Sequence, residues 1–114
     1  MIIADHKTIQ EIQNEFNATF PNLKLEFYKQ KHGVGEGSPI QTQLETDNKL
    51  RAIRNKHVDG DLIVRPELKV KELENAFEDQ FGLHVQVFRK AGNLWMQTTA
   101  TDDWSLLEQN NRGA

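Results

Sequence analysis

Residues 69–90 of the chain read KVKELENAFEDQFGLHVQVFRK, and this stretch decides the fold. Its first half carries an apolar residue every three or four positions, which is the spacing of an amphipathic helix. Gly82 interrupts that spacing, and the residues after it follow the pattern of a half-buried strand. The stretch therefore predicts a helix that leads directly into a strand. The apolar positions are Val70, Leu73, Phe77 and Phe81 in the helix, then Leu83, Val85, Val87 and Phe88 in the strand.

Residues 8–29, TIQEIQNEFNATFPNLKLEFYK, follow the same order of helix, breaker and strand. Thr8 stands three residues before Glu11, the spacing of a capping box. Pro21-Asn22 replaces the glycine as the breaker. We interpret the two stretches as parts of two pseudo-repeats, residues 1–45 and 61–100, while convergence of two common helix–strand units is the alternative. The matched stripe is Ile9, Ile12, Phe16 and Phe20, each 61 positions before its counterpart, and the strands match at an offset of 60.

The predicted fold class is α+β, a two-layer sandwich of two pseudo-repeated β-α-β-β units with a C-terminal helix over residues 101–110. Its 114 residues suit a single domain, residues 1–114. Ile2-Ile3 and Ile63-Val64 are the expected first strands of the two units. The order of elements is similar to that of ferredoxin-like sandwiches, an analogy from which no function can be carried over.

Each unit is expected to continue into a return strand. In the second unit, a turn at Ala91-Gly92 predicts that Phe88 lies opposite Trp95 and Val87 opposite Met96. In the first unit, Ile40, Thr42 and Leu44 alternate as a return strand after a long loop. The pattern further predicts a short helix with Leu50 and Ile53, capped at Thr46-Asp47. A last helix is predicted to start at Thr101-Asp102-Asp103 and to bury Trp104, with residues 110–114 frayed.

Composition narrows the function classes. The chain has no cysteine, which excludes disulfides, thiolate metal sites and cysteine nucleophiles. Its net charge of −3 argues against a nucleic-acid partner, because neutralisation of phosphates supplies most of the affinity in such complexes. The start at Met1 lacks the features of a signal peptide, and no apolar run reaches the length of a membrane span. We expect a cytoplasmic protein with no membrane partner.

An aromatic sheet face is the leading candidate for a binding site. Phe88 and Trp95 are predicted to share one side of the sheet, with Tyr28 at the equivalent place in the first unit. Trp104 of the C-terminal helix is the fourth candidate partner-binding residue. Aromatic residues dominate binding hot spots, so an exposed cluster would bind a protein partner or form a homodimer. The alternative is internal coverage by the C-terminal helix with Trp104 or by the short helix with Leu50 and Ile53.

A glycine-rich loop at residues 32–39 is the second candidate. Its glycines permit a nest of backbone N–H groups that could bind a small anion or a phospho-ligand. The sequence lacks the Gly-Lys-Ser/Thr ending of a Walker loop, and a flexible hairpin tip is the alternative. The residues of this anion hypothesis are Lys29, Lys31, His32, Gly33, Gly35, Gly37, Ser38, Arg89 and Lys90.

The sequence offers no catalytic constellation, and we predict no cofactor, no metal and a non-catalytic function. The segment from His57 to Asp61 alternates an imidazole with two carboxylates, but its spacing matches no recognised metal site. Asp102-Asp103 fits the start of a helix better than a pair of catalytic acids. Lys49, Arg51, Arg54 and Lys56 form a basic run that is expected to be a solvated face.

The run Phe81–Lys90, together with Trp95, Thr101-Asp102-Asp103-Trp104 and Glu108-Gln109-Asn110, resembles a family of small bacterial proteins without an assigned activity. The resemblance covers most of the chain. It implies a stand-alone bacterial domain, and it supplies no catalytic residues that could be carried over.

Overall fold

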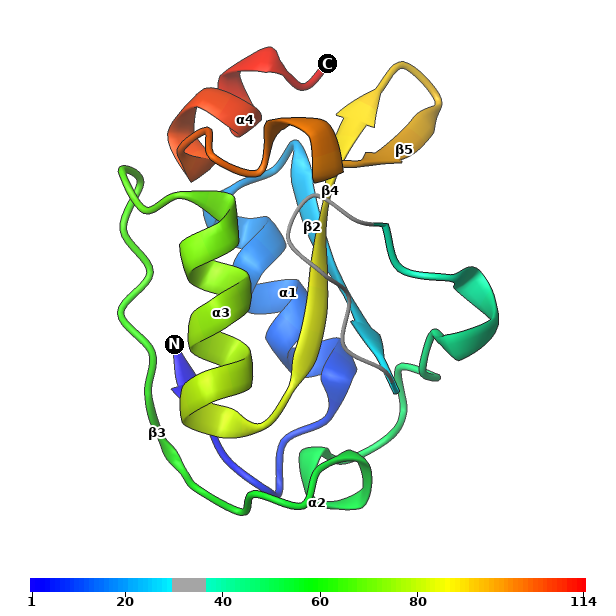
Figure 1. The fold of residues 1–114 in the computed structure, drawn as a ribbon, viewed down its shortest axis with the longest axis vertical. Helices are drawn as coiled ribbons and strands as arrows, with labels where there is room; N and C mark the ends of the chain where they lie inside the picture. Colours follow the sequence, from blue (N-terminus) through cyan, green and yellow to red (C-terminus); the bar gives the residue numbers. More distant parts are fainter. Residues whose placement is uncertain (30–36) are drawn as a thin grey trace.

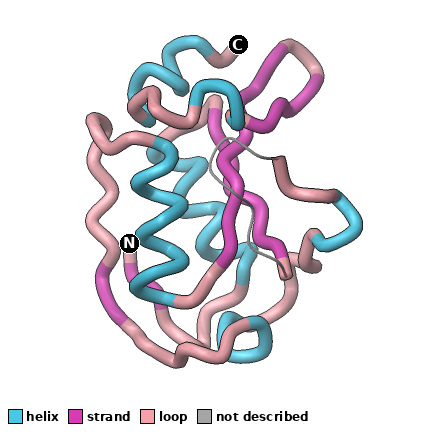
Figure 2. Tube along the Cα trace, viewed as in Figure 1, coloured by secondary structure: helices cyan, strands magenta, loops and turns pink. Residues whose placement is uncertain are grey.

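Two long helices lie side by side against one face of an antiparallel sheet in the computed structural model, which describes residues 1–29 and 37–114 (Figure 1). The described residues form four α-helices and two antiparallel sheets, a mixed α and β architecture (Figure 2). The helices are α1 (Ile9–Thr19), α2 (Leu50–Ile53), α3 (Val70–Phe81) and α4 (Leu106–Arg112). The strands are β1 (Ile2–Ile3), β2 (Leu23–Tyr28), β3 (Gly60–Asp61), β4 (His84–Ala91) and β5 (Leu94–Gln97). No helix among these residues has both the length and the apolar character needed to cross a membrane.

Both long helices begin and end where the sequence patterns predict. At the start of α1, the backbone N–H of Glu11 donates to Thr8 Oγ1 at 3.2 Å, while the Glu11 carboxylate accepts from the Thr8 N–H. At the end of α3, Gly82 has a φ of 64° and its N–H donates to the Glu78 carbonyl. The bond from the Gly82 N–H to the Glu78 carbonyl, with Gly82 left-handed, is that of an αL cap, and the N–H of Leu83 also donates to the Phe77 carbonyl.

The larger sheet has the strand order β2-β4-β5. Strand β2 pairs antiparallel with β4, with Leu25 opposite Val87 and Phe27 opposite Val85. These apolar side chains face α1 and α3, and the Phe27 ring meets the Phe77 ring edge-on at 6.0 Å between centroids. The sheet face toward the helices is therefore the core face, as the alternation of residues predicts.

The turn of the second hairpin is Gly92-Asn93 rather than Ala91-Gly92. Ala91 pairs with Leu94, so Phe88 lies opposite Gln97 and the predicted pairing of Phe88 with Trp95 is wrong. Gly92, the first residue of the turn, has a φ of 62°. A tight hairpin turn with glycine at its first central position has the twist that the flanking strands need, which fixes the turn one residue later.

Strand β1 does not join the larger sheet. Ile2 pairs with Asp61 and Ile3 with Gly60, which makes a separate two-stranded sheet of β1 and β3. Ile63 and Val64 do not form the expected strand. The residues that pair with β1 are Gly60 and Asp61, just before them in the sequence. The element order of the ferredoxin-like analogy is therefore not carried through in the larger sheet.

The first return strand is also shorter than predicted. Residues Ile40–Thr42 form a 3-10 turn, and only Gln43 makes an antiparallel bridge, with Tyr28. Leu44 N–H donates to the Phe27 carbonyl at 2.8 Å, so the segment still follows the outer edge of β2. The short helix predicted after it is confirmed as α2, although Lys49 and not Thr46-Asp47 occupies its N-cap.

The C-terminal helix starts later than predicted. Ser105 is the N-cap of α4, and its Oγ accepts the Glu108 N–H at 3.1 Å, while residues 99–101 form a 3-10 turn. The expected fraying after Asn110 is wrong. Helix α4 runs to Arg112, and Ala114 bonds to the backbone of Lys90 and Gly92 in the hairpin.

The helix starts meet in pairs, an arrangement that the sequence did not reveal. Antiparallel bridges join Thr8 to Lys49 and Lys69 to Ser105, so α1 starts against α2 and α3 against α4. The first N–H groups of each helix, which have no partner within the helix, donate to carbonyls of the turn before the other helix. These bonds include Ile9 N to Asn48 O, Leu50 N to Lys7 O, Val70 N to Trp104 O and Leu106 N to Leu68 O, at 2.8 to 3.0 Å.

The buried apolar side chains form one cluster between the two long helices and the sheet. Phe16 of α1 and Phe77 of α3, which the sequence pattern matches, are both buried there. Leu50 of α2 and Leu106 of α4 close the cluster at the helix starts. Residues from both halves of the chain thus share a single core.

Candidate functional site

Strand β5 carries three consecutive large apolar side chains that are exposed: Leu94 at 70%, Trp95 at 36% and Met96 at 49% of their full surface. The strand lies at the end of the sheet order, so within the described part of the chain no strand pairs with its outer edge. Residues 94–97 include neither a charge nor a proline. Charged residues and prolines are the usual protection of an edge strand, and β5 lacks both.

Phe88 and Trp95 are brought together on the sheet face that points away from the helices. The Lys24 ammonium lies 5.2 Å from the centroid of each ring, which is a cation–π distance. Lys24 Nζ is also 3.3 Å from Glu26 Oε1. Phe88 and Trp95, two of the four predicted partner-binding aromatic residues, therefore share one surface. Lys24, which is paired with Glu26, contacts both rings there.

Tyr28 and Trp104 do not belong to this surface. Tyr28 is buried, and its burial together with the charge of Glu26 raises the pKa of its phenol well above the usual value. Trp104 lies between two guanidinium groups, at 5.5 Å from that of Arg89 and 5.6 Å from that of Arg112. Because Arg89 follows Phe88 in β4, its side chain leaves the sheet on the opposite face. The C-terminal helix consequently does not cover Phe88 and Trp95 through Trp104.

Most of the predicted anion loop, including Lys31, His32, Gly33 and Gly35, lies outside the described residues. Its described end is fixed to β5. Gln97 accepts the Ser38 N–H at 2.9 Å and donates through Nε2 to the Ser38 carbonyl at 3.0 Å. A Cβ at Gly37 would come within 2.7 Å of Gln97 Oε1, so this close approach favours glycine. The side chain of Gln97 therefore holds residues 37 and 38 against the second hairpin.

The basic residues of the anion hypothesis that the structure describes are Lys29, Arg89 and Lys90, and they do not lie close together. Lys29 follows the end of β2 at which Tyr28 pairs with His84. Arg89 pairs with Leu23 at the other end of the same ladder, and Lys90 lies one residue further. Arg89 Nη1 also donates to Gln109 Oε1 at 2.7 Å. The antiparallel pairing thus separates the charges that the repeat pattern had grouped.

A buried polar cluster lies at the centre of the β2–β4 ladder, where Glu26 is opposite Gln86. Gln13 Nε2 donates to Glu26 Oε2 at 3.3 Å, and Gln86 Nε2 donates to Glu74 Oε2 at 3.2 Å. Glu74 also accepts the Val87 N–H at 3.0 Å. These residues read as solvated positions in the sequence, and only the offset of 61 between Gln13 and Glu74 hinted at a shared role.

Arg54 is the centre of a second polar cluster. Its side chain is fully buried, and its guanidinium donates to Asp5, Asp59 and the carbonyls of Val58 and Phe81 at 2.8 to 3.1 Å. The prediction that Arg54 lies on a solvated basic face is wrong. An arginine with five donors ties three separate segments together here, which a basic run in a sequence does not reveal.

Asp5 connects this cluster to His57, whose Nδ1 lies 2.9 Å from Asp5 Oδ2. Desolvation of Asp5 acts to raise its pKa, but the hydrogen bonds and charges of Arg54 and His57 outweigh it and hold the pKa below its usual value. The pair has the form of an oriented imidazole. In the described chain no hydroxyl or thiol is bonded to His57, so the pair lacks the nucleophile of a triad.

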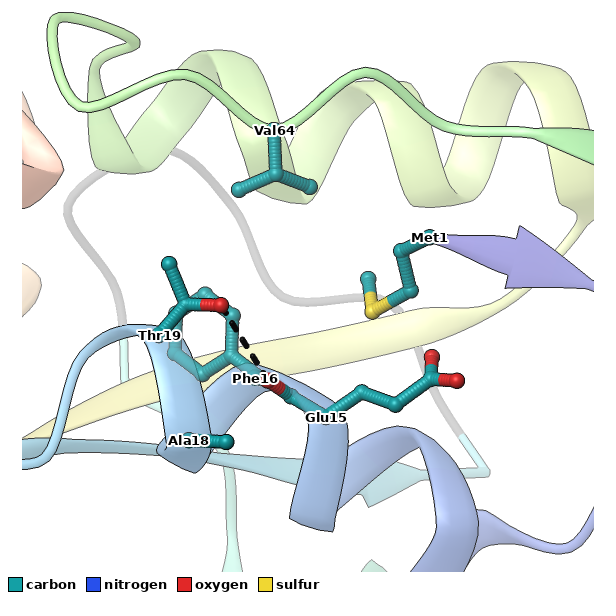
Figure 3. Close-up of a pocket in the computed structure, with 6 residues that line it drawn as sticks. All are labelled: Met1, Glu15, Phe16, Ala18, Thr19 and Val64. Carbon is teal, nitrogen blue, oxygen red and sulfur yellow. Dashed lines mark hydrogen bonds between the residues drawn. The ribbon is translucent and has the colours of Figure 1, made fainter.

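An apolar hollow of about 380 Å³ opens between α1 and the segment that follows β3 (Figure 3). Val64 and Met1 face Phe16 across it, and Glu15 and Thr19 form part of its lining. Thr19 Oγ1 donates to the Glu15 carbonyl at 3.4 Å, and the Glu15 carboxylate bonds to Lys7 Nζ at 3.1 Å. The polar groups of the lining thus already have partners within the chain, and the hollow has no evident chemistry.

No group of three histidine, cysteine, aspartate or glutamate side chains in residues 1–29 and 37–114 is placed to hold a metal ion. Comparisons with protein-family models, with curated proteins and with solved structures give no match. The surface of Lys24, Phe88 and Trp95 with the exposed edge of β5, here called the hairpin surface, is therefore the candidate site.

Proposed function

We propose that the chain is a non-catalytic binding module that pairs with a second copy of itself through the hairpin surface. The observation that carries the proposal is the uncharged, exposed edge of β5, with Trp95 exposed on one face of the strand and Leu94 and Met96 exposed on the other. Large exposed apolar groups on an open strand edge are uncommon in proteins that stay monomeric.

A second copy suits this edge for reasons of charge and geometry. Two copies of β5 can pair antiparallel about a two-fold axis. Both copies then use the same surface, and every contact between two residues occurs twice, once on each side of the axis. A strand without charge brings no like charges together in such a pair. Trp95 would lie within the new interface, where tryptophan is among the residues that contribute most to binding energy.

We also propose that residues 1–45 and 61–100 are diverged copies of one unit. The pairing of Glu26 with Gln86, which are 60 positions apart and matched by the repeat, supports this. The bridges of Thr8 with Lys49 and of Lys69 with Ser105 support it as well, since Thr8 and Lys69 are matched at the offset of 61.

Light scattering coupled to size-exclusion chromatography tests the dimer. We expect the mass of a dimer for the wild type at high concentration, and the mass of a monomer for Leu94→Lys, because a lysine on the edge of β5 opposes strand pairing. Leu107→Lys is the matched control, as Leu107 is about half exposed on α4 and should leave the dimer intact.

A wild-type monomer at every concentration, or a dimer that Leu94→Lys leaves unchanged, would refute the proposal. Circular dichroism on each variant shows whether the fold is kept. A hairpin surface that captures a different protein while the wild type stays monomeric would likewise count against self-association.

A further inference from the structure

A groove of about 240 Å³ runs along the outer edge of β2, beside α1. It is distinct from the hollow of Figure 3, although both border α1. Its lining combines amide side chains, one ion pair and one indole ring. The residues are Gln10, Gln13, Asn14, Asn17, Lys24, Leu25, Glu26 and Trp95.

The four amides lie on one stripe of α1, because positions 10, 13, 14 and 17 follow the spacing of one helix face. Gln10, Asn14 and Asn17 are exposed, while Gln13 is half-buried. Asparagine is a poor helix former, so two of them within α1 are not there to stabilise the helix. The stripe needs another explanation than core packing or helix propensity.

The inner amides are held in a fixed orientation. Gln13 Nε2 donates to the Leu25 carbonyl at 2.8 Å, and Asn17 Nδ2 donates to the Leu23 carbonyl at 2.9 Å. With these NH₂ groups bound to the edge of β2, the amide oxygens of Gln13 and Asn17 are left as acceptors, and no described residue donates to them. Acceptors that are held in place before a ligand arrives lose little entropy on binding.

The outer pair supplies the complementary group. Gln10 Nε2 donates to Asn14 Oδ1 at 2.9 Å, which leaves the NH₂ group of Asn14 as a donor with no bonded acceptor in the described chain. The groove therefore presents both donors and acceptors within one helix face. A hydroxyl group can donate and accept at once, so a ligand rich in hydroxyls matches this lining.

Charge and shape narrow the ligand further. The Lys24 ammonium is paired with Glu26 at 3.3 Å, so the groove holds no uncompensated charge that would select an anion. Trp95 adds a flat apolar surface, about a third exposed, next to the polar groups. A sugar ring has an apolar face of C–H groups and a rim of hydroxyls, which fits an indole beside a row of amides.

We infer that this groove binds a neutral saccharide, with Trp95 against one face of a sugar ring and the amides of α1 bonded to its hydroxyls. This inference goes beyond the proposed dimer. It shares Trp95 with the hairpin surface, but its polar contacts come from α1, which the dimer does not require.

Fluorescence titration with cellotetraose, maltotetraose and chitotetraose tests the inference. The Leu94→Lys/Trp104→Phe variant, which should be monomeric, leaves Trp95 as the single tryptophan and free of the dimer interface, so a saturable change in emission reports on the groove. We expect a saturable change with at least one of these oligosaccharides. Asn14→Ala in the same background should weaken the binding about tenfold, the effect of one lost hydrogen bond to a ligand. Gln80→Ala, an exposed amide on α3, is the control and should leave the binding constant unchanged.

Two further measurements keep the result clear. In nuclear magnetic resonance spectra the side-chain NH₂ signals of Asn14 and Asn17 should shift with the same oligosaccharide. Leu94→Lys, which should abolish the dimer, should still bind the oligosaccharide, so the two proposals can fail separately. The inference would be overturned if none of the three oligosaccharides changed the emission or the NH₂ signals at concentrations up to about 50 mM. At that concentration even a complex with a millimolar Kd would be largely formed. A response to inorganic phosphate alone would overturn it as well.

Discussion

Glu26 of β2 and Gln86 of β4 face each other across the ladder, and each is bonded to a side chain of the helix that precedes its strand. In the first half of the chain the helix supplies the amide, Gln13, and the strand supplies the carboxylate, Glu26. In the second half the helix supplies the carboxylate, Glu74, and the strand supplies the amide, Gln86. Each buried carboxylate therefore has an amide donor. This exchange satisfies both groups without placing two carboxylates directly opposite each other.

Removal of the Glu74 carboxylate should destabilise the fold. Glu74 accepts the Val87 N–H and the Gln86 amide; in Glu74→Ala the buried Val87 N–H would lose this acceptor, while Gln86 Nε2 would keep only its 3.3 Å bond to the Val87 carbonyl. A buried donor without a partner costs about 1–3 kcal/mol, so we expect the free energy of unfolding to fall by about 2 kcal/mol. Urea denaturation followed by circular dichroism measures it.

Asn75→Ala is the control for Glu74→Ala, because Asn75 is exposed on the same helix. Its free energy of unfolding should stay within about 0.5 kcal/mol of the wild type, as for most surface substitutions. Equal effects of the two substitutions would contradict the role of Glu74 as the acceptor for Gln86 and Val87 of β4.

Arg54→Lys should destabilise the fold, although the substitution retains the positive charge. Lysine keeps the charge but loses the planar fork that reaches Asp5, Asp59 and two carbonyls. Breaking a buried, hydrogen-bonded ion pair costs about 3–5 kcal/mol, and a partial loss of about 2–3 kcal/mol is expected here. Arg51→Lys, on the exposed side of α2, serves as the comparison in the same urea titration, and a similar loss there would argue against the cluster.

Asp5 should make the fold sensitive to acid. Its folded pKa lies below the ordinary value of 3.8, so its contribution to stability is complete above about pH 4 and is lost as the pH falls through the folded pKa. The wild type should therefore exceed Asp5→Asn in unfolding free energy at neutral pH, and the difference should shrink below about pH 4. Urea titrations at several pH values measure it, with Asp47→Asn as the exposed control. A difference that grows in acid would have the wrong sign.

The long helices and the strands β2 and β4 could be predicted because burial leaves a period in the sequence. Phe77 and Phe81 had to lie on one helix face, and Val85 and Val87 on one strand face, whatever their neighbours were. The register of the hairpin could not be predicted in the same way. Ala91-Gly92 and Gly92-Asn93 are both plausible two-residue turns, and only the φ of Gly92 within the folded hairpin selects the second.

The polar clusters were missed for a related reason. Arg54 has the sequence context of an exposed basic helix, and its burial depends on carboxylates 49 positions before and 5 positions after it. The exposure of Trp95 was predicted as one of two alternatives, because the sequence did not place the C-terminal helix. Tertiary contacts between distant residues decided each of these positions.

Matched core phenylalanines should contribute similarly to stability. Phe16 and Phe77 are both buried in the single core, so Phe16→Ala and Phe77→Ala should each lower the free energy of unfolding by about 3–5 kcal/mol. Thermal unfolding and urea denaturation both report the loss. Ile40→Ala is the control, since Ile40 is largely exposed and its truncation should have little effect. A large loss for only one phenylalanine would count against equivalent roles of the two helices.

Two glycines with left-handed backbone conformations should respond differently to alanine. Gly82 and Gly92 have φ values of 64° and 62°, and an alanine in this region costs about 1–2 kcal/mol relative to glycine. A Cβ at Gly92 would meet no atom within 4 Å, whereas a Cβ at Gly82 would lie 2.8 Å from Lys56 Cβ. We therefore expect Gly92→Ala to lower the free energy of unfolding by about 1 kcal/mol and Gly82→Ala by about 2 kcal/mol or more.

Asparagine separates the two causes of these losses. It tolerates the left-handed region better than alanine does, so Gly92→Asn should be milder than Gly92→Ala. Gly82→Asn keeps the contact of its Cβ with Lys56 and should recover less. Urea denaturation of the four variants gives the comparison. If Gly82 and Gly92 responded alike to both substitutions, backbone strain alone would explain the losses, and the close approach of Lys56 to the end of α3 would have no energetic effect.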